Sequence, residues 1–168
     1  TEVSGIISSN TTWSLLSSPY IVTGSILVNE DVTLTIQAGV ELKFDSGKSL
    51  QINGELIAQG TGENKITFTS NESSPAAGDW GKISFFDSSV DAVFANNGTY
   101  SSGSILEYCI VEYGSGIYLQ LGNPFFNYCT IKHHNDVGIK IDNYNVSNSG
   151  ATVKVTNSTI SYNNRGIE

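Results

Sequence analysis

Hydrophobic and polar residues alternate in short runs along most of the chain. One run is Val32-Thr-Leu-Thr-Ile36, and similar runs begin at Val40, Leu50, Ile66 and Ile83. A period of two places alternate side chains on opposite faces of a strand, and the residues between the runs are mainly Gly, Asn, Asp and Ser, which favour turns. Almost no window has the i, i+3, i+4 spacing of an amphipathic helix. The pattern therefore predicts an all-β chain.

The alternating runs recur, first in the N-terminal half. The segment Ile36-Gln-Ala-Gly-Val40 matches Ile52-Asn-Gly-Glu-Leu56, sixteen residues later. In this alignment Leu34 falls on Leu50, and every other inward position also stays apolar. We therefore expect these segments to be stacked neighbours in a repeat structure.

The C-terminal half repeats more clearly. Three blocks share an apolar first position, a small fourth position and an apolar last position: Leu106–Val111, Phe126–Ile131 and Val155–Ile160. The small residues at the fourth position are Cys109, Cys129 and Ser158. A Gly-Ile pair follows each block, at Gly116-Ile117, Gly138-Ile139 and Gly166-Ile167. Only the connecting loops change length, as is typical of coiled repeat proteins.

The repeat length selects the architecture. A repeat of roughly 16 to 30 residues without a helix is too short for a propeller blade, which needs about 40, but suits a coil of two or three short strands. Successive coils of a parallel β-helix stack at about 4.8 Å, so equivalent residues form ladders. The alignment predicts one ladder of Tyr113, His133 and Tyr162, and beside it an opposite-charge pair of Glu112 and Lys132.

These blocks resemble the right-handed parallel β-helix repeat of pectate-lyase-like proteins and of many bacterial and archaeal surface proteins. The shared pattern, apolar-x-x-(small or Asn)-x-apolar followed by Gly-Ile, covers residues 105–168 well and residues 20–100 more loosely. The segment Gly78-Asp-Trp-Gly-Lys-Ile-Ser-Phe85 is similar to a block that recurs in such surface proteins. The resemblance implies the fold, but it implies no single activity, because lyases, hydrolases, epimerases, spikes and adhesins share this fold.

We expect a single β-helix, residues 20–168, preceded by an N-terminal cap. Residues 1–19 do not repeat, and Trp13 with Leu15 and Leu16 offers an apolar lid for the first coil. The chain stops within a repeat, so we expect an uncapped C-terminal coil, covered by a neighbouring domain or by another copy of the chain. Head-to-tail assembly into a filament would involve both ends. The candidate assembly residues are Thr1, Val3, Ile6, Ile7, Gly166 and Ile167.

Charge and composition limit the partners. The net charge is -8, and eight scattered basic residues do not make a surface for nucleic acid or for anionic membranes. No apolar run approaches the roughly 20 residues needed for membrane insertion. The absence of Met, the low content of charged residues and five N-x-[ST] sequons suit a mature secreted or cell-surface glycoprotein. The candidate glycosylation sites are Asn10, Asn71, Asn97, Asn145 and Asn157.

The resemblance also raises the question of a lyase site. Enzymes of the pectate-lyase-like group bind Ca²⁺ through clustered carboxylates and use a basic residue to abstract a proton. The candidate acids are Asp87 with Asp91 and Asp136 with Asp142, and the only arginine is Arg165. We expect these to be solvated turn residues and therefore expect no catalytic site and no cofactor, with Ca²⁺ as the one candidate ion.

Two further kinds of site have weak support. Glycoside hydrolysis needs two carboxylates in one cleft, and Glu107 and Glu112 lie in one coil, but the alignment gives Glu107 no acidic neighbour. The adjacent His133 and His134 suggest a metal site, yet neighbouring residues of an extended segment point to opposite faces. We expect neither site to be present.

Cys109 and Cys129 are the only cysteines, and the alignment places them one coil apart. A Cα separation near 4.8 Å is within the range of a disulfide, and secretion permits such a bond. In-register parallel neighbours do not aim their Cβ atoms at each other, however. We therefore favour two buried free thiols that act as small hydrophobic residues.

Three functions follow from these observations. The first is a non-catalytic structural or adhesive module of a surface protein, and the second is a subunit that polymerises head to tail. The third is carbohydrate binding or polysaccharide processing, in which sugars stack on the aromatic columns Tyr108/Tyr128 or Tyr113/His133/Tyr162. We expect the first.

Overall fold

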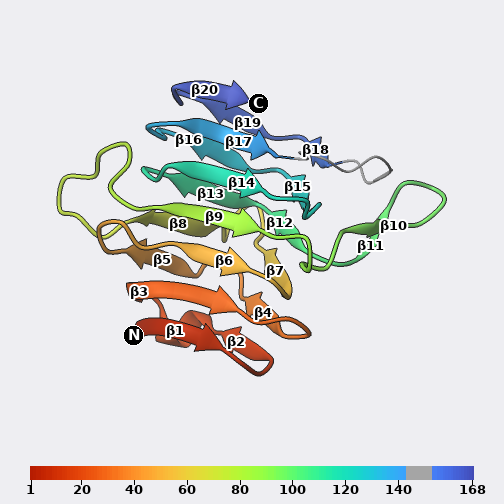
Figure 1. Cartoon of the computed structure of the whole chain (residues 1–168), viewed down its shortest axis with the longest axis horizontal. Helices are drawn as coiled ribbons and strands as arrows, with labels where there is room; N and C mark the ends of the chain where they lie inside the picture. The colour runs from red at the N-terminus through yellow and green to blue at the C-terminus, as the bar shows by residue number, and fades with distance from the viewer. Residues whose placement is uncertain (143–152) are drawn as a thin grey trace.

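Three ribbons of parallel strands wind around one hydrophobic core in the computed structural model, which describes residues 1–142 and 153–168 (Figure 1). One ribbon is a six-stranded sheet. The other two are arms of a twelve-stranded sheet, which are joined because the long strand β3 (Tyr20–Val28) pairs with one arm through its first half and with the other through its second half. The predicted fold class, an all-β right-handed parallel β-helix, is confirmed.

Each ribbon contains one strand from each successive coil along the axis. The first arm holds β5 (Glu41–Phe44), β8 (Ile66–Ser70), β13 (Cys109–Glu112), β16 (Thr130–Lys132) and β19 (Thr159–Ser161). The second arm holds β6 (Leu50–Ile52), β9 (Lys82–Phe85), β14 (Gly116–Leu119), β17 (Val137–Ile141) and β20 (Arg165–Ile167). The six-stranded sheet holds β2 (Thr11–Trp13), β4 (Thr33–Ile36), β7 (Glu55–Gln59), β12 (Ile105–Glu107), β15 (Phe125–Asn127) and β18 (Lys154–Thr156).

The core follows from the alternation within these strands. Inward positions are apolar and almost completely buried, as in β5, where Leu42 and Phe44 are buried and Glu41 and Lys43 are not. Leu42 pairs with Phe68 in the next coil, and Phe68 pairs with Val111. Because each inward residue contacts its equivalents above and below, the buried residues form continuous ladders along the axis.

The register predicted for the C-terminal half is confirmed. Phe126 pairs with Leu106 on one side and with Val155 on the other. Ile131 likewise pairs with Val111 and Ile160. The Gly-Ile pairs also stack: Ile139 lies between Ile117 and Ile167.

The register predicted for the N-terminal half is wrong. Leu34 pairs with Leu56, whereas Leu50 pairs with Ile26 and Ile83 on another ribbon. The sixteen-residue alignment matched β4 with β6, two strands of the same coil. The strands β4, β5, β6 and β7 of the three ribbons alternate in the same way, so an alignment that keeps inward positions apolar does not identify the stacked partner.

The first nineteen residues extend the ribbons. β1 (Glu2–Ile7) pairs in parallel with β3, and β2 pairs in parallel with β4. Trp13, which was expected in a lid, is buried and stacks on Tyr20 with ring centroids 5.0 Å apart. The other two lid residues are exposed on a short 3-10 helix, Leu15–Ser17, so the expectation for Leu15 and Leu16 is not met.

A hairpin of β10 (Val93–Phe94) and β11 (Tyr100–Ser102) projects from the side of the stack between β9 and β12 (Figure 1). Phe94 and Tyr100 pack against Phe125 of β15. Lys154 of β18 lies over the Phe94 ring at 4.2 Å, and its ammonium group donates to the carbonyl of Gly98 at 3.0 Å. Aromatic packing and this cation therefore hold the hairpin to the coils.

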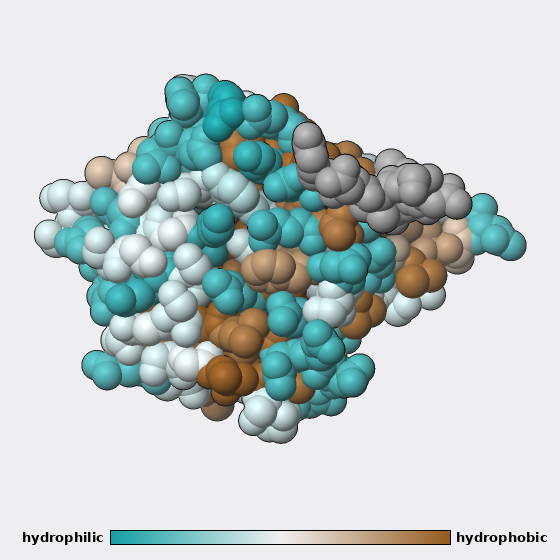
Figure 2. All heavy atoms as spheres, in the orientation of Figure 1, coloured by the Kyte–Doolittle hydropathy of each residue, from teal (hydrophilic) through white to brown (hydrophobic). Residues whose placement is uncertain are grey.

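The outer surface is mixed in character. On the face shown in Figure 2, hydrophilic residues surround separate hydrophobic patches. Over the described ranges, 1–142 and 153–168, no helix is long and apolar enough to cross a membrane.

Candidate functional site

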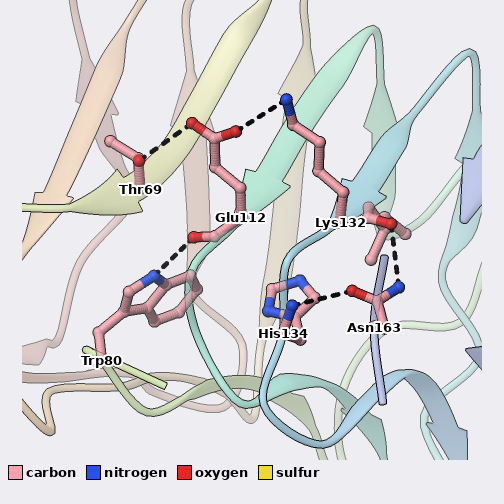
Figure 3. A network of polar contacts seen from close by, with 7 residues as sticks. Thr69, Trp80, Glu112, Lys132, His134 and Asn163 are labelled. Carbon is pink, nitrogen blue, oxygen red and sulfur yellow. Dashed lines mark hydrogen bonds and ion pairs between the residues drawn. The ribbon is translucent and has the colours of Figure 1, made fainter. Parts of the chain in front are cut away.

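A polar row crosses three consecutive coils on the outer face of β8, β13 and β16 (Figure 3). Thr69 Oγ1 donates to Glu112 Oε1 at 3.1 Å, and Glu112 Oε2 lies 3.2 Å from Lys132 Nζ. Glu112 and Lys132 are register partners, so the predicted charge pair is confirmed. The row results from stacking of equivalent positions, and each polar group in it has its neighbour in the next coil as partner.

An aromatic column runs beside this row, at the turn that follows each strand. The rings of Tyr113 and His133 are 5.4 Å apart and those of His133 and Tyr162 are 5.2 Å apart, both nearly parallel. The predicted ladder is confirmed. All three residues have φ between 55° and 65°, so the same left-handed turn is repeated and the rings superpose. Stacking stabilises side chains at a backbone conformation that large residues seldom adopt.

A second column precedes the same strands. Tyr108 and Tyr128 stack with ring centroids 4.6 Å apart and planes 3° from parallel, and Asn157 continues the column at the same positive φ. In both columns neighbouring rings cover one face of each other. The last ring of each column is the most exposed, Tyr128 at 44% and Tyr162 at 79%.

Trp80 and His134 lie beneath the polar row, in the interior (Figure 3). The indole N–H of Trp80 donates to the carbonyl of Glu112 at 2.8 Å. His134 is 2% exposed, and its Nδ1 accepts from the backbone N–H of Gly114 at 3.1 Å. The backbone N–H of His134 donates to Asn163 Oδ1. These bonds tie the corners of successive coils together.

The two histidines therefore occupy opposite sides of the wall, as predicted. His133 stacks in the outer column, whereas burial lowers the pKa of His134. Since Nδ1 accepts a hydrogen bond, the proton of the neutral ring is on Nε2, which is buried without a partner among the described residues. The described residues contain no group of three or more side chains suited to a metal ion.

Both cysteines are free and buried. Cys129 Sγ donates to the carbonyl of Leu106 at 3.2 Å, and Cys109 Sγ donates to that of Ala58 at 3.4 Å. Burial raises the pKa of Cys109 well above its usual value. The sulfurs are thus packed into the inner wall as protonated thiols, which agrees with the preferred interpretation of the sequence.

Asp136 and Asp142, paired in the lyase hypothesis, lie at opposite ends of β17. Asp136 accepts hydrogen bonds from Tyr118 and from Arg165, the residue considered as a lyase base. Burial and the bond to Asp136 raise the pKa of Tyr118 to about 12. Lys82 lies over the Tyr118 ring at 4.1 Å. The arginine is therefore part of an ion-paired surface network.

In the other two predicted carboxylate pairs, Asp91, Glu107 and Glu112 accept hydrogen bonds from different residues. Asp91 accepts from the backbone and side-chain N–H groups of Asn123, which joins the loop before the hairpin to the loop between β14 and β15. Glu107 accepts from Asn127 and Gln59 on the six-stranded sheet, whereas Glu112 lies on the other sheet. Glu107 and Glu112 therefore do not share a cleft. The sequence did not indicate that Asp87 and Asp142 line the same hollow.

Four of the five sequon asparagines are exposed in the described chain. Asn97 lies at the tip of the β10–β11 hairpin, and Asn10 accepts from the backbone N–H of Thr33. The side-chain amides of Asn71 and Asn157 each donate to a neighbouring side chain. Asn145 lies outside the described residues. Glycosylation of these sites stays a prediction.

The candidate assembly residues are split between the two ends. Val3 and Ile7 pack against the core from β1, while Ile6 is 66% exposed. Thr1 uses its ammonium group to donate to the carbonyl of Pro19. Gly166 and Ile167 belong to β20, which pairs with β17. Val3, Ile6 and Ile7 thus lie on β1, and Gly166 and Ile167 lie on β20. Each of these two strands pairs with one other strand among the described residues.

Comparison with known proteins agrees with this architecture. A family described as "Pectate-lyase like beta helix domain" matches residues 5–117. No curated protein and no solved structure matches the chain. The matched region extends from β1 into β14 and includes the N-terminal coils.

Proposed function

The chain belongs to the family of pectate-lyase-like β-helix domains, and from this premise we propose that it is a non-catalytic structural or adhesive module of a secreted or cell-surface protein. The observation that supports this role is the pairing of outer side chains between coils. Glu112 with Lys132, and Tyr113 with His133 and Tyr162, interact with each other along the axis. Such ladders stiffen a rod and do not converge on a reacting bond.

An assay for turnover tests the proposal. The purified chain is incubated with acidic and neutral polysaccharides, with and without Ca²⁺, and unsaturated products and new reducing ends are measured. The expected result is no turnover in either condition and no change of melting temperature with a chelator. Turnover that requires Ca²⁺ would instead assign the chain to the catalytic members of its family.

Head-to-tail association into a filament is a second proposal, supported by the strand edges. Five strands pair along one edge only in the described chain: β1 and β2 at one end, and β18, β19 and β20 at the other. All of them are parallel to their partners, so a second copy stacked along the axis meets a strand of matching direction. The register between β1 and β3 shifts between Val3 and Gly5, and such an irregularity at the edge opposes pairing with a further strand.

Electron microscopy over a range of concentrations separates these two proposals. Filaments with an axial repeat of one β-helix support assembly, and Ile6→Lys on the exposed side of β1 is then expected to shorten them. Single particles at every concentration contradict assembly and leave the rod-like module.

Carbohydrate binding is the alternative that the aromatic columns favour least. Sugars stack on free ring faces, but Tyr108 with Tyr128 and Tyr113 with His133 cover each other. Tyr162, at 79% exposed, is the most accessible ring, and Tyr128 at the end of the other column is 44% exposed. Binding of a glycan that is lost in Tyr162→Ala would support this alternative, and binding that Tyr162→Ala leaves intact would place the glycan elsewhere.

A further inference from the structure

The sequence contains two Asn-Gly pairs, Asn53-Gly54 and Asn97-Gly98, and the structure places them in different surroundings. An asparagine that precedes glycine is prone to lose its side-chain amide as ammonia. The backbone nitrogen of the next residue attacks the side-chain Cγ, and a glycine has no Cβ to obstruct this approach. The attack closes a five-membered ring, so it requires a backbone that is free to rotate.

Asn97-Gly98 lies at the tip of the hairpin formed by β10 and β11. Both residues are exposed, and a Cβ on Gly98 would meet nothing within 4 Å. The backbone N–H of Gly98 donates to the carbonyl of Ala95 at 2.8 Å, within the turn itself. A hydrogen bond within an exposed turn opens without disturbing the core. The attacking nitrogen is therefore accessible in the folded chain.

The same turn polarises the side-chain carbonyl of Asn97. The backbone N–H of Thr99 donates to Asn97 Oδ1 at 3.0 Å. Attack on Cγ moves negative charge onto Oδ1, and a donor that already points at this oxygen stabilises the charge. The hairpin tip thus supplies both an accessible nucleophile and an activated electrophile.

Asn53-Gly54 lies in the turn between β6 and β7, where the neighbouring coils enclose it. The backbone N–H groups of Asn53 and Gly54 both donate to the carbonyl of Val28 in the coil below, at 2.9 and 3.2 Å. The carbonyl of Gly54 accepts from the backbone N–H of Val90 at 2.9 Å. A Cβ on Gly54, which is buried, would lie 2.2 Å from the carbonyl oxygen of Val32. Rotation of this turn therefore requires the coils to separate.

We propose that Asn97 is a deamidation site, at which the folded chain converts this asparagine to aspartate and isoaspartate, whereas Asn53 is protected. The nitrogen of Gly98 bonds to Asn97 Cγ as the Cγ–Nδ2 bond breaks, and the amide proton of Gly98 leaves with Nδ2 as ammonia. Water then opens the cyclic imide. Opening at the side-chain carbonyl gives aspartate, and opening at the backbone carbonyl gives isoaspartate. Water is the only co-reactant.

The modification changes the hairpin in two ways. It adds a carboxylate to the tip, where the ammonium group of Lys154 lies 3.0 Å from the carbonyl oxygen of Gly98, and isoaspartate also adds a methylene to the backbone. Asn97 begins the sequon Asn97-Gly98-Thr99, and deamidation removes the amide to which a glycan would be attached. Glycosylation and deamidation therefore exclude each other at this residue. The proposal is independent of the structural role proposed above.

Incubation of the purified, unglycosylated chain at pH 8 and 37 °C, followed by peptide mass spectrometry, tests the proposal. Asn97 is expected to convert from amide to acid at least tenfold faster than Asn53, with isoaspartate as the larger product. In urea, where both turns are open, the two rates are expected to differ by less than about threefold. Asn97→Gln keeps an amide at the tip but would need a six-membered ring, so conversion there is expected to stop. Asn53→Gln is the matched control and should leave the rate at Asn97 unchanged.

Three results would overturn the proposal. The first is equal rates at Asn53 and Asn97 in the folded chain. The second is an Asn97 that stays intact in the folded chain for as long as it takes to convert in urea. The third is a product that contains aspartate alone, because direct hydrolysis without the cyclic imide forms no isoaspartate. Melting curves confirm that each variant is folded, and if Asn53→Gln is unfolded, the two asparagines of the wild-type chain still give the comparison.

Discussion

Trp80 stacks on Phe44 in the interior, with ring centroids 4.2 Å apart and planes 13° from parallel. Phe44 ends β5 and Trp80 precedes β9, so the contact joins two coils and both arms of the larger sheet. Both side chains are essentially inaccessible to solvent. The indole N–H reaches one coil further, to the carbonyl of Glu112. This pair therefore links three coils through one side chain.

Replacing Trp80 is expected to cost much of the stability of the fold. Trp80→Ala removes a fully buried ring and leaves a cavity, which costs about 3–5 kcal/mol. Trp80→Phe keeps most of the stack but loses the hydrogen bond to Glu112, at a cost of about 1–3 kcal/mol because the carbonyl is left unsatisfied. Urea unfolding measures both. A loss in Trp80→Ala no greater than in Trp80→Phe would show that the stack contributes little.

The glycines of the Gly-Ile pairs are expected to differ in tolerance. A Cβ on Gly116, at φ 114°, would lie 1.9 Å from the carbonyl oxygen of Val137 in the next coil, and one on Gly138 would lie 2.5 Å from Ile160. A Cβ on Gly166 meets nothing within 4 Å. Gly116→Ala should cost more than about 2 kcal/mol, and Gly166→Ala should change stability by less than about 0.5 kcal/mol.

Thermal melting of these alanine variants is the measurement. The order of destabilisation should be Gly116, then Gly138, then Gly166, because the coil above approaches the first two closely. A Gly166→Ala variant as unstable as Gly116→Ala would mean that this position is also covered in solution.

Stability is expected to fall as the pH drops through the range of His134. Burial lowers the pKa of this histidine in the folded state, so below about pH 6.5 the unfolded chain binds a proton that the folded chain does not. The free energy of unfolding therefore decreases with decreasing pH until the folded-state pKa is reached. Above pH 6.5 this contribution is constant.

Urea unfolding between pH 5 and pH 8 measures the effect, with His134→Gln as the test and His133→Gln as the matched control. The pH dependence should diminish in His134→Gln and persist in His133→Gln, whose ring stacks in the outer column. The reverse pattern would assign the dependence to the outer histidine.

The C-terminal register was predictable because its repeats carry distinctive residues. Tyr113, His133 and Tyr162 fix the alignment at a turn position, and Cys109 with Cys129 fixes it within the strands. The N-terminal coils have no such markers. There, an apolar alternation common to all three ribbons allowed β4 to be aligned with β6, and the true partner Leu56 was missed.

The sites were less predictable than the fold. Sequence separation suggested Asp87 with Asp91, whereas coil stacking brings Asp87 to the same hollow as Asp142. Correct alignment of β9, β14 and β17 is required to see this, and β9 was not included in the repeat. Side-chain partners such as Trp80 with Glu112 depend on corner geometry that the apolar pattern does not encode.

The charged row is expected to matter less than the core. Glu112 and Lys132 are partly exposed, with side-chain exposures of 16% and 32%, and exposed ion pairs contribute about 0.2–1 kcal/mol. Lys132→Gln should therefore lower stability by no more than about 1 kcal/mol, and the difference from wild type should shrink in 1 M salt. Urea unfolding at low and high salt measures this. A larger, salt-independent loss would mean that packing of the lysine stem is the main contribution.

Cys109 and Cys129 are expected to be unreactive in the folded protein. Both are buried, and burial raises the pKa of Cys109, so little of the reactive thiolate is present at neutral pH. A disulfide-exchange reagent should label neither thiol in the native chain and both after unfolding, with an intact mass that corresponds to two free thiols. Cys109→Ser is the control for polarity, because it places a hydroxyl in the inner wall and should destabilise the fold, whereas Cys109→Ala keeps the site apolar. A mass lower by two hydrogens would show instead that the two coils are covalently joined, and reduction would then lower the melting temperature.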